Sequence, residues 1–477
     1  MSRNPALRAL AAVLVLSSAP ALAGPAELLW RTEAEAMEVA GSLAPPAILD
    51  ASRADFPTSL ASEERPSVEI QVRESMPLSM RRGNAERGSI RSDGRELRLS
   101  VPLAQDGGSP WHIGWRVADG DERWYRRLRW NDTSLDAEWR ERTLGVAWSN
   151  DRWTLGAAQT QADLSGRFTG RTVAKLQHVG MGREGVTLAG GGALDTVAVE
   201  HRAGRWLAGL QLSERDANAG LPVVAEGRDY LGAFTYRQRR LNAWLTLGDG
   251  HGQWFAWASD SSLDPGPNAI LAGRAIRGRM ELSAGASAFG VGLRRELPAA
   301  TTHLELSHHE HALDLSGWLD RGALGGGLTG RYRAKATARA RTWVARVARE
   351  RRHERWRWRW GLSAAWSELD IYGRYVDSAG PLRRPLHQWE QKLTDGEASL
   401  AGVTLGAGYD AEDWRIDATG LMLAGDMSAH FEDLTATPPP PQPRSGPAQF
   451  PTEPLPSGPG ARLSPGWIIT VRVSHSL

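Results

Sequence analysis

Arginine is the residue type in this chain best suited to ligand chemistry, and in several short segments it occupies every second position. In ERWRWRWG (354–361), three arginines alternate with three tryptophans. A guanidinium stays charged at physiological pH and holds carboxylate or phosphate groups in a fixed fork. Such a segment could be a nucleic-acid patch, a membrane-disrupting peptide or a β-strand with two unlike faces.

Overall charge argues against nucleic-acid binding. The chain of 477 residues carries 57 basic and 55 acidic side chains, and Arg3 and Arg8 account for the whole basic excess. A nucleic-acid binder usually shows a clear basic surplus. Cysteine is absent, which excludes disulfides, thiolate zinc sites and a cysteine nucleophile.

One dense cluster of polar residues could support other chemistry. Ser307, His308, His309, Glu310 and His311 follow one another between two alternating segments. In an extended chain His309 and His311 share a face, and paired imidazoles can bind zinc or copper. The alternative is a solvated polar turn of a hairpin. Phosphate-loop, nucleophile-elbow and metalloprotease motifs are absent from the sequence, so we assign no catalytic residue, metal or cofactor.

The N-terminus predicts export. Residues 1–23 combine two arginines, an apolar run and a small-x-small cleavage site at Ala21-Leu22-Ala23, as in a secretory signal peptide. A buried N-terminal helix is the alternative. Residues 24–66 would then form a periplasmic or luminal segment, in which 27–43 could form a short amphipathic helix.

From residue 67 to 477 the chain alternates with a period of two. SVEIQVRE places Val68, Ile70 and Val72 on one face, and WHIGWRV does the same with Trp111 and Trp115. Successive side chains of a strand point to opposite faces, so each segment has one apolar and one polar face. Alternation over roughly 400 residues favours a transmembrane β-barrel, with a soluble sandwich, propeller or solenoid as the alternative.

The C-terminal strand carries a family resemblance. WIITVRVSHSL places Trp467, Ile469, Val471, Val473 and Leu477 on one face. This resembles the final strand of Gram-negative outer-membrane β-barrel (porin-like) proteins, in which the last residue is usually aromatic rather than leucine. No specific subfamily is indicated.

The resemblance implies an all-β fold, a transmembrane antiparallel up-and-down β-barrel of about 16–18 strands with a short non-barrel N-terminal segment. It also implies a bacterial outer-membrane location with outer-membrane lipid and lipopolysaccharide around the barrel. The barrel-assembly machinery would bind the C-terminal strand.

Tryptophan, with 21 copies, outnumbers tyrosine and phenylalanine combined. Indole rings prefer the headgroup level of a membrane. We therefore expect interfacial tryptophans near the strand ends: Trp139, Trp148, Trp153, Trp356, Trp358, Trp360, Trp414 and Trp467.

Loop lengths predict the orientation. If the last strand runs inward, the proline-rich connection at about 430–464 is extracellular, and so is the long connection at 377–397. The short turn at 409–413 would be periplasmic.

With the apolar faces outward, arginines gather on the inward face. The candidate lumen residues are Arg98, Arg116, Arg346, Arg355, Arg357, Arg359, Arg374, Arg415 and Arg472. Acids on the same face are fewer, so we expect the compensating acids in loops and turns; the inward acids are Glu69, Glu96, Asp136, Glu138, Asp229, Asp370 and Asp417. Charged rings set selectivity in pores, so one hypothesis is passive diffusion of small hydrophilic, in particular anionic, solutes. The alternative is that these arginines pair with acids across strands and stiffen the wall.

Two further functions stay open at this stage. An arginine-lined barrel with large outer loops also suits export or surface assembly of an exopolysaccharide, with Trp244 and Tyr372 stacking on sugars. An outer-membrane hydrolase is a second alternative, although we favour a non-enzymatic protein. Neither the solute nor the oligomeric state can be read from the sequence.

Overall fold

A computed structural model describes most of the chain from residue 57 onward. The described residues are 57–62, 65–75, 78–82, 85–103, 111–127, 132–170, 186–225, 228–249, 252–265, 270–273, 276–321, 330–379, 384–433 and 458–477. The predicted signal peptide (1–23) and the helix considered for 27–43 lie outside these residues.

The described strands form one closed antiparallel sheet. Strands β1 (Ser67–Ser75) and β2 (Leu78–Arg82) both pair with the same two neighbours, β3 and β18, and so make one stave. Strands β10 (Gly252–Pro265) and β11 (Ile270–Gly273) likewise share β9 and β12. The sheet therefore has 16 staves and closes where β18 meets β1. This confirms the predicted all-β, up-and-down barrel and its strand number.

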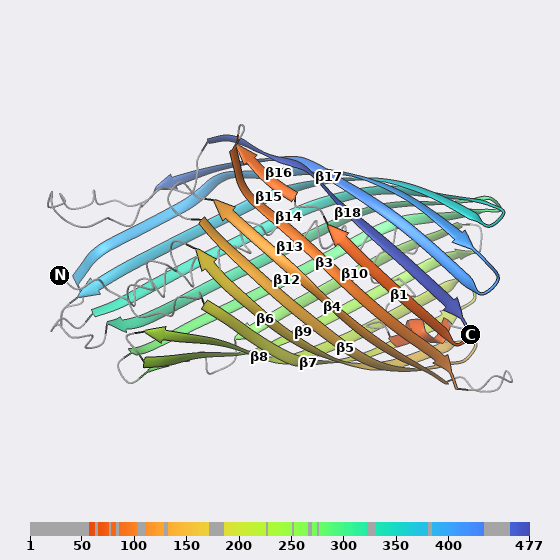
Figure 1. The fold of residues 1–477 in the computed structure, drawn as a ribbon, viewed down its shortest axis with the longest axis horizontal. Helices are drawn as coiled ribbons and strands as arrows, with labels where there is room; N and C mark the ends of the chain where they lie inside the picture. The colour runs from red at the N-terminus through yellow and green to blue at the C-terminus, as the bar shows by residue number, and fades with distance from the viewer. Residues whose placement is uncertain are drawn as a thin grey trace.

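The other strands follow in chain order, each paired with its sequence neighbours (Figure 1). They are β3 (Ala85–Pro102), β4 (Trp111–Arg127), β5 (Asp132–Ser149), β6 (Trp153–Gly170), β7 (Val186–Ala203), β8 (Trp206–Ala225), β9 (Arg228–Asp249), β12 (Ile276–Leu297), β13 (Ala300–Arg321), β14 (Gly330–His353), β15 (Trp356–Ala379), β16 (Arg384–Asp410), β17 (Trp414–Asp433) and β18 (Gly458–Ser476).

Both ends of the sheet lie together at one end of the barrel, which we call the terminal end. The Leu477 amide donates to the Pro66 carbonyl oxygen at 2.8 Å. Two- or three-residue turns join most neighbouring strands at this end, for example between Ser149 and Trp153, whereas residues 103–110 separate β3 from β4. At the opposite end, the intervals from Gly170 to Val186 and from Asp433 to Gly458 lie outside the described residues.

The outer face of the barrel carries an apolar band near the terminal end, with Arg295, Arg349 and Arg351 on the turn side of the band, and is charged farther along. On β4, Trp111 and Trp115 face outward, 48% and 39% exposed, and Asp119 follows on the same face. The first outward charge beyond the apolar band is, strand by strand, Glu74, Asp119, Arg142, Asp163, Asp195, Glu214, Arg239, Asp260, Glu310, Arg341, Glu368, Glu397 and Asp426. An apolar band is what a bilayer requires of an outer wall.

The strands are longer than this band. β16 has 27 residues and β15 has 24, whereas about 9–11 tilted residues cross a bilayer. Their outer charged portions therefore extend the barrel past the apolar band, which gives the elongated shape in Figure 1.

The structure corrects the loop predicted for 377–397. Residues 377–379 belong to β15 and 384–397 to β16, so only 380–383 connect the two strands. Tyr375 and Trp389 are paired across these strands, and backbone pairing of this kind converts the expected loop into a hairpin. In the second predicted loop, 430–433 and 458–464 are strand, and 434–457 lies outside the described residues.

Seven of the eight predicted interfacial tryptophans lie on the outer face. Trp148, Trp153, Trp356 and Trp414 stand beside the turns of the terminal end, as do Trp111, Trp206 and Trp254. Trp358 and Trp360 lie farther along the outer face of β15. On β18, Trp467 is the fifth outward residue counted from the C-terminal end of the strand.

Trp139 was assigned to the wrong face. It shares the inward face of β5 with Thr143, which is 1% exposed, and its indole covers inward-facing Gly94 and Gly120. Glu138 and Arg140 face outward in its place, because this part of β5 lies beyond the apolar band.

The described residues of the N-terminal segment before β1 contain no strand. Its described part is a 3-10 helix, η1 (Pro57–Ser62), which packs on β4, β5, β6 and β7. Leu60 of η1 contacts inward-facing Gly114 and Gly145, so η1 lies on the inner wall. Among the described residues, no helix is long and apolar enough to cross a membrane.

Substituting glycine for Glu354, in the turn at the start of ERWRWRWG, should stabilise the barrel. Glu354 adopts φ 53°, a left-handed conformation that costs a non-glycine residue about 1–2 kcal/mol. We expect Glu354→Gly to raise the free energy of unfolding by about 1 kcal/mol. Urea titration of the barrel in detergent micelles measures this.

Gly204, at φ 61°, is the matched control. No atom lies within 4 Å of the Cβ that an alanine would add. Gly204→Ala should therefore lower the free energy of unfolding by about 1 kcal/mol through backbone strain alone. Equal midpoints for both variants and the native chain would contradict the assignment of strain to these turns.

Candidate functional site

The candidate site is the charged part of the inner wall. The inner face of the barrel carries seven of the nine predicted lumen arginines: Arg98, Arg116, Arg346, Arg357, Arg359, Arg415 and Arg472. Each lies within 4.0 Å of at least one acidic side chain.

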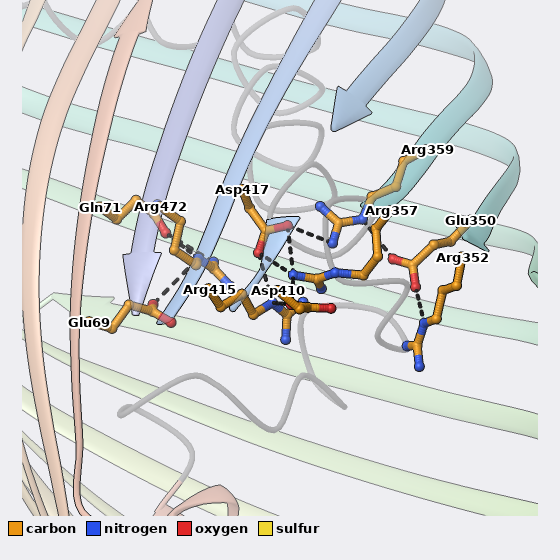
Figure 2. Close-up of polar contacts among 10 residues, drawn as sticks. All are labelled: Glu69, Gln71, Glu350, Arg352, Arg357, Arg359, Asp410, Arg415, Asp417 and Arg472. Atoms are coloured by element: carbon orange, nitrogen blue, oxygen red, sulfur yellow. Dashed lines mark hydrogen bonds and ion pairs between the residues drawn. The ribbon is translucent and has the colours of Figure 1, made fainter. Parts of the chain in front are cut away.

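One network spans β14 to β17, near the terminal end (Figure 2). At its centre is Asp417, whose Oδ1 lies 2.8 Å from Arg359 Nη2 and 3.3 Å from Arg357 Nη2. Arg415 Nε contacts the other oxygen of Asp417 at 2.8 Å. On its far side Arg359 donates Nε to Glu350 at 2.7 Å. One carboxylate thus ties three arginines from two strands.

The two ends of this network are exposed to solvent. Arg352 Nε donates to Glu350 at 2.7 Å, and Arg357 Nη2 lies 2.6 Å from Asp410. Arg352 is 60% exposed and Asp410 47%, whereas Arg359 and Glu350 are each 1% exposed. The inner members are therefore fully enclosed.

A second network crosses the closure of the barrel. Arg472 of β18 donates to Gln71 Oε1 of β1 at 2.9 Å and lies 3.4 Å from Glu69 (Figure 2). Glu69 is also 3.6 Å from Arg98 of β3. Arg472 and Gln71, 401 positions apart in the chain, thus share a hydrogen bond across the seam between the first and last strands.

The same network continues toward β5. Arg98 pairs with Glu96 on its own strand, and Arg116 of β4 contacts Glu96 at 3.0 Å. Arg116 Nη1 reaches Glu141 of β5 at 3.0 Å. We call the two networks together the arginine belt, from Glu141 on β5 through the seam to Arg352 on β14.

Two predicted lumen arginines are misplaced by the sequence argument. Arg355 lies in the two-residue turn between β14 and β15 and is exposed. Arg374 shares the outer face of β15 with Trp356 and Trp366, 3.7 Å from Glu390. It lies beyond the apolar band, where an outward charge has no cost.

The alternation placed Glu96 and Asp417 on the inward face, and the structure has them there, but further compensating acids lie on the inner wall and not in the loops and turns expected for them. Glu96, Glu305, Glu350 and Asp417 lie on the inner wall rather than in loops, and each contacts an arginine. Each was a visible acid in an alternating segment. The arginine that each acid contacts lies on another strand or at another position of the same face. Identifying it requires knowledge of the register between the strands.

The wall opposite the arginine belt is aromatic. Trp244, Phe255 and Trp257 form a buried cluster on β9 and β10, and His303 of β13 stacks on Phe255 at 5.1 Å. The Trp257 indole donates to Glu305 at 3.1 Å. The rings lie against glycines of the neighbouring strands, such as Gly209 under Trp244.

Tyr372, the other ring considered for sugar stacking, shares the outer face of β15 with Arg374. Its predicted inward direction was wrong.

The histidine cluster lies in the middle of β13 and not in a hairpin turn. Ser307 Oγ is 3.0 Å from His309 Nε2, but Ser307 is 1% exposed. His309 and His311 share the inner face, as expected. Within the described strands, no three His, Cys, Asp or Glu side chains come together in a geometry that could hold a metal ion.

The geometry has a direct chemical consequence. A guanidinium already bound by one or two carboxylates offers little charge to a passing solute, and a buried pair is rigid. The arginine belt is therefore suited to bracing the wall and to presenting a polar, nearly neutral surface to water.

No protein-family model matches this chain, and no curated protein sequence does. Among solved structures, the P. putida toluene transporter TodX overlaps with a TM-score of 0.40 at 10% identity, covering 88% of this chain and 92% of that chain. The CymD monoaromatic hydrocarbon channel gives 0.39 at 9%, covering 88% and 91%. A bacterial polysaccharide outer membrane secretin gives 0.36 at 8%, covering 87% and 99%. At these TM-scores no conclusion about this chain depends on the overlaps.

We expect removal of the acid at the centre of the arginine belt to lower the stability of the barrel strongly. Asp417→Asn leaves Arg357 and Arg359 with one carboxylate fewer in an enclosed position. We expect the free energy of unfolding to fall by roughly 3 kcal/mol, as for other broken buried pairs. Urea midpoints of the folded barrel measure the change.

Asp136→Asn is the matched control, because its partner Arg123 is 65% exposed and Asp136 47%. Exposed pairs contribute little to stability. If both variants unfold at the same urea concentration, the arginine belt does not stabilise the barrel.

Proposed function

We propose that this protein is an outer-membrane pore for passive diffusion of small hydrophilic solutes. The observation that supports it is the closed barrel of 16 staves with an apolar band outside and polar side chains inside. Barrels of that size enclose an aqueous channel.

The ion pairs favour a pore that is only weakly selective for charge. They argue against a strong preference for anions. The seven inward arginines of the candidate set all have acidic partners. Selectivity follows the net charge that a wall presents to permeating ions. A nearly neutral wall passes small cations and anions at similar rates.

Location and orientation belong to the same proposal. The signal-like residues 1–23 would export the chain, and outer-membrane lipid and lipopolysaccharide would surround the apolar band. The terminal end, with its short turns, would face the periplasm. The barrel-assembly machinery would recognise β18, on which Trp467, Ile469 and Val471 face outward and Ile468 inward, as the final-strand pattern requires.

Export of a polysaccharide is the second candidate, and the aromatic inner wall favours it. Tryptophan rings stack on sugars, and Trp139 and Trp244 lie on the inner face. Trp244 is only 5% exposed, however, so its ring has no free face for a sugar. Passive diffusion is the better supported function.

Reconstitution into planar lipid bilayers tests the pore. We expect discrete conductance steps and, under a potassium chloride gradient, a reversal potential close to zero. A strongly cation- or anion-selective reversal potential would contradict the neutral wall. Purified protein that folds without detergent or lipid and produces no steps would contradict the pore itself.

Removing one acid should make the pore prefer anions. Glu69 lies between Arg98 and Arg472, at 3.6 and 3.4 Å, and Glu69→Gln releases positive charge into the lumen. We expect the reversal potential to shift toward that of chloride. Glu74→Gln, on the outer face of the same strand, removes the same charge and should leave the reversal potential unchanged. Equal shifts in both variants would mean that the inner face does not set selectivity.

A further inference from the structure

The inner wall has a floor of small residues at the terminal end. Gly114 of β4 and Gly145 of β5 are direct cross-strand partners, and Ala158 of β6 extends the row. Gly156 and Ala147 form the next row toward the terminal end. All of them point inward. Each residue of this floor lies among the six residues of its strand that are nearest the terminal end.

Helix η1 occupies this floor. A Cβ at Gly114 would overlap the Leu60 side chain, and one at Gly145 would lie 3.0 Å from it. A Cβ at Gly156 would lie 2.7 Å from Pro57 Cβ. Real Cβ atoms essentially never come as close as those at Gly114 and Gly156 would, and the contact at Gly145 would be tight, so the three glycines make room for η1. Leu60 is 6% exposed as a result.

A polar contact fixes η1 from the side. Thr58 Oγ1 donates to Glu200 of β7 at 3.3 Å, and Thr58 is 5% exposed. The Trp244 indole also hydrogen-bonds to Glu200. Helix η1 is thereby connected to the aromatic wall as well as to the glycine floor.

We propose that the floor formed by Gly114, Gly145 and Gly156 is a binding site for η1, and that η1 held there narrows the channel at its terminal end. This inference rests on the proposed pore function. Elsewhere on the inner wall, inward glycines lie under side chains of neighbouring strands, such as Gly408 under Arg357 and Gly209 under Trp244, whereas the three glycines of β4, β5 and β6 lie under η1. Bracing of the wall by η1, with no effect on permeation, is the competing outcome.

The first experiment tests whether η1 lies on the glycine floor. The chain has no cysteine, so Leu60→Cys with Gly114→Cys is a clean disulfide pair. Leu60 Cγ lies 3.2 Å from the Cβ that residue 114 would carry, and a disulfide needs about 3 Å between one sulfur and the opposite Cβ. We expect oxidation of the full barrel to form this bond. Failure to form it, while Leu60→Cys alone reacts with a maleimide, overturns the inference.

The second experiment tests the narrowing. Gly156→Ala pushes on Pro57, and Leu60→Asp places a charge in the contact. Both should raise single-channel conductance, on the order of twofold for a barrel of this size. Gly361→Ala, on the inner face of β15, is the control, because its Cβ would make only ordinary contacts of 3.4 Å or more. It should leave conductance at the native value.

The outcomes separate the two proposals. If the disulfide forms and Gly156→Ala and Leu60→Asp conduct like the native chain, η1 braces the wall and the inference fails, while the pore stands. If the disulfide forms but no variant and no native protein conducts, the proposed pore function fails and the narrowing fails with it. Higher conductance in Gly361→Ala as well would also overturn the inference.

Discussion

Alternation of side chains across a closed sheet is the constraint on which this structure depends. Each strand must satisfy two surroundings at once, because neighbouring residues face opposite sides of the same wall. Closure of β18 on β1 leaves no edge with unpaired backbone groups, which is the condition for a sheet to survive in lipid. The alternating arginines and tryptophans obey this constraint from Trp356 onward: Trp358 faces outward and Arg359 is enclosed on the inner wall.

The sequence predicts the barrel well wherever the outer face is apolar. There the rule that apolar side chains face outward held for Trp356, Ile469 and their neighbours. Beyond the apolar band both faces contact water, and the rule carries no information about direction. Trp139 and Arg374 were placed on the wrong faces for that one reason. The loop expected at 377–397 failed similarly, since polar strands past the membrane resemble loops in composition.

The site could be predicted only in part. That arginines gather inside follows from alternation, but their partners depend on register and tilt between strands. Nothing local marks Asp417 as the carboxylate shared by Arg357, Arg359 and Arg415. The seat of η1 is less visible still, because Gly114 and Gly156 acquire meaning only when residues 57–62 lie against them. One inward glycine near the same end of three consecutive strands is the signal that could have suggested a packed segment there.

The seam between β1 and β18 has a consequence for how the molecule is made. Arg472 and Gln71 are 401 residues apart, so their contact cannot form until the whole chain has emerged and the last hairpin has come round to the first. Until then two strand edges with unpaired backbone groups are exposed, and such edges invite pairing with other chains. A closure of this span is also slow, because its loop entropy is lost before any contact across it forms. Until the seam closes, the unpaired edges of the first and last strands therefore stay open to pairing with other chains, which makes the unclosed barrel prone to aggregation.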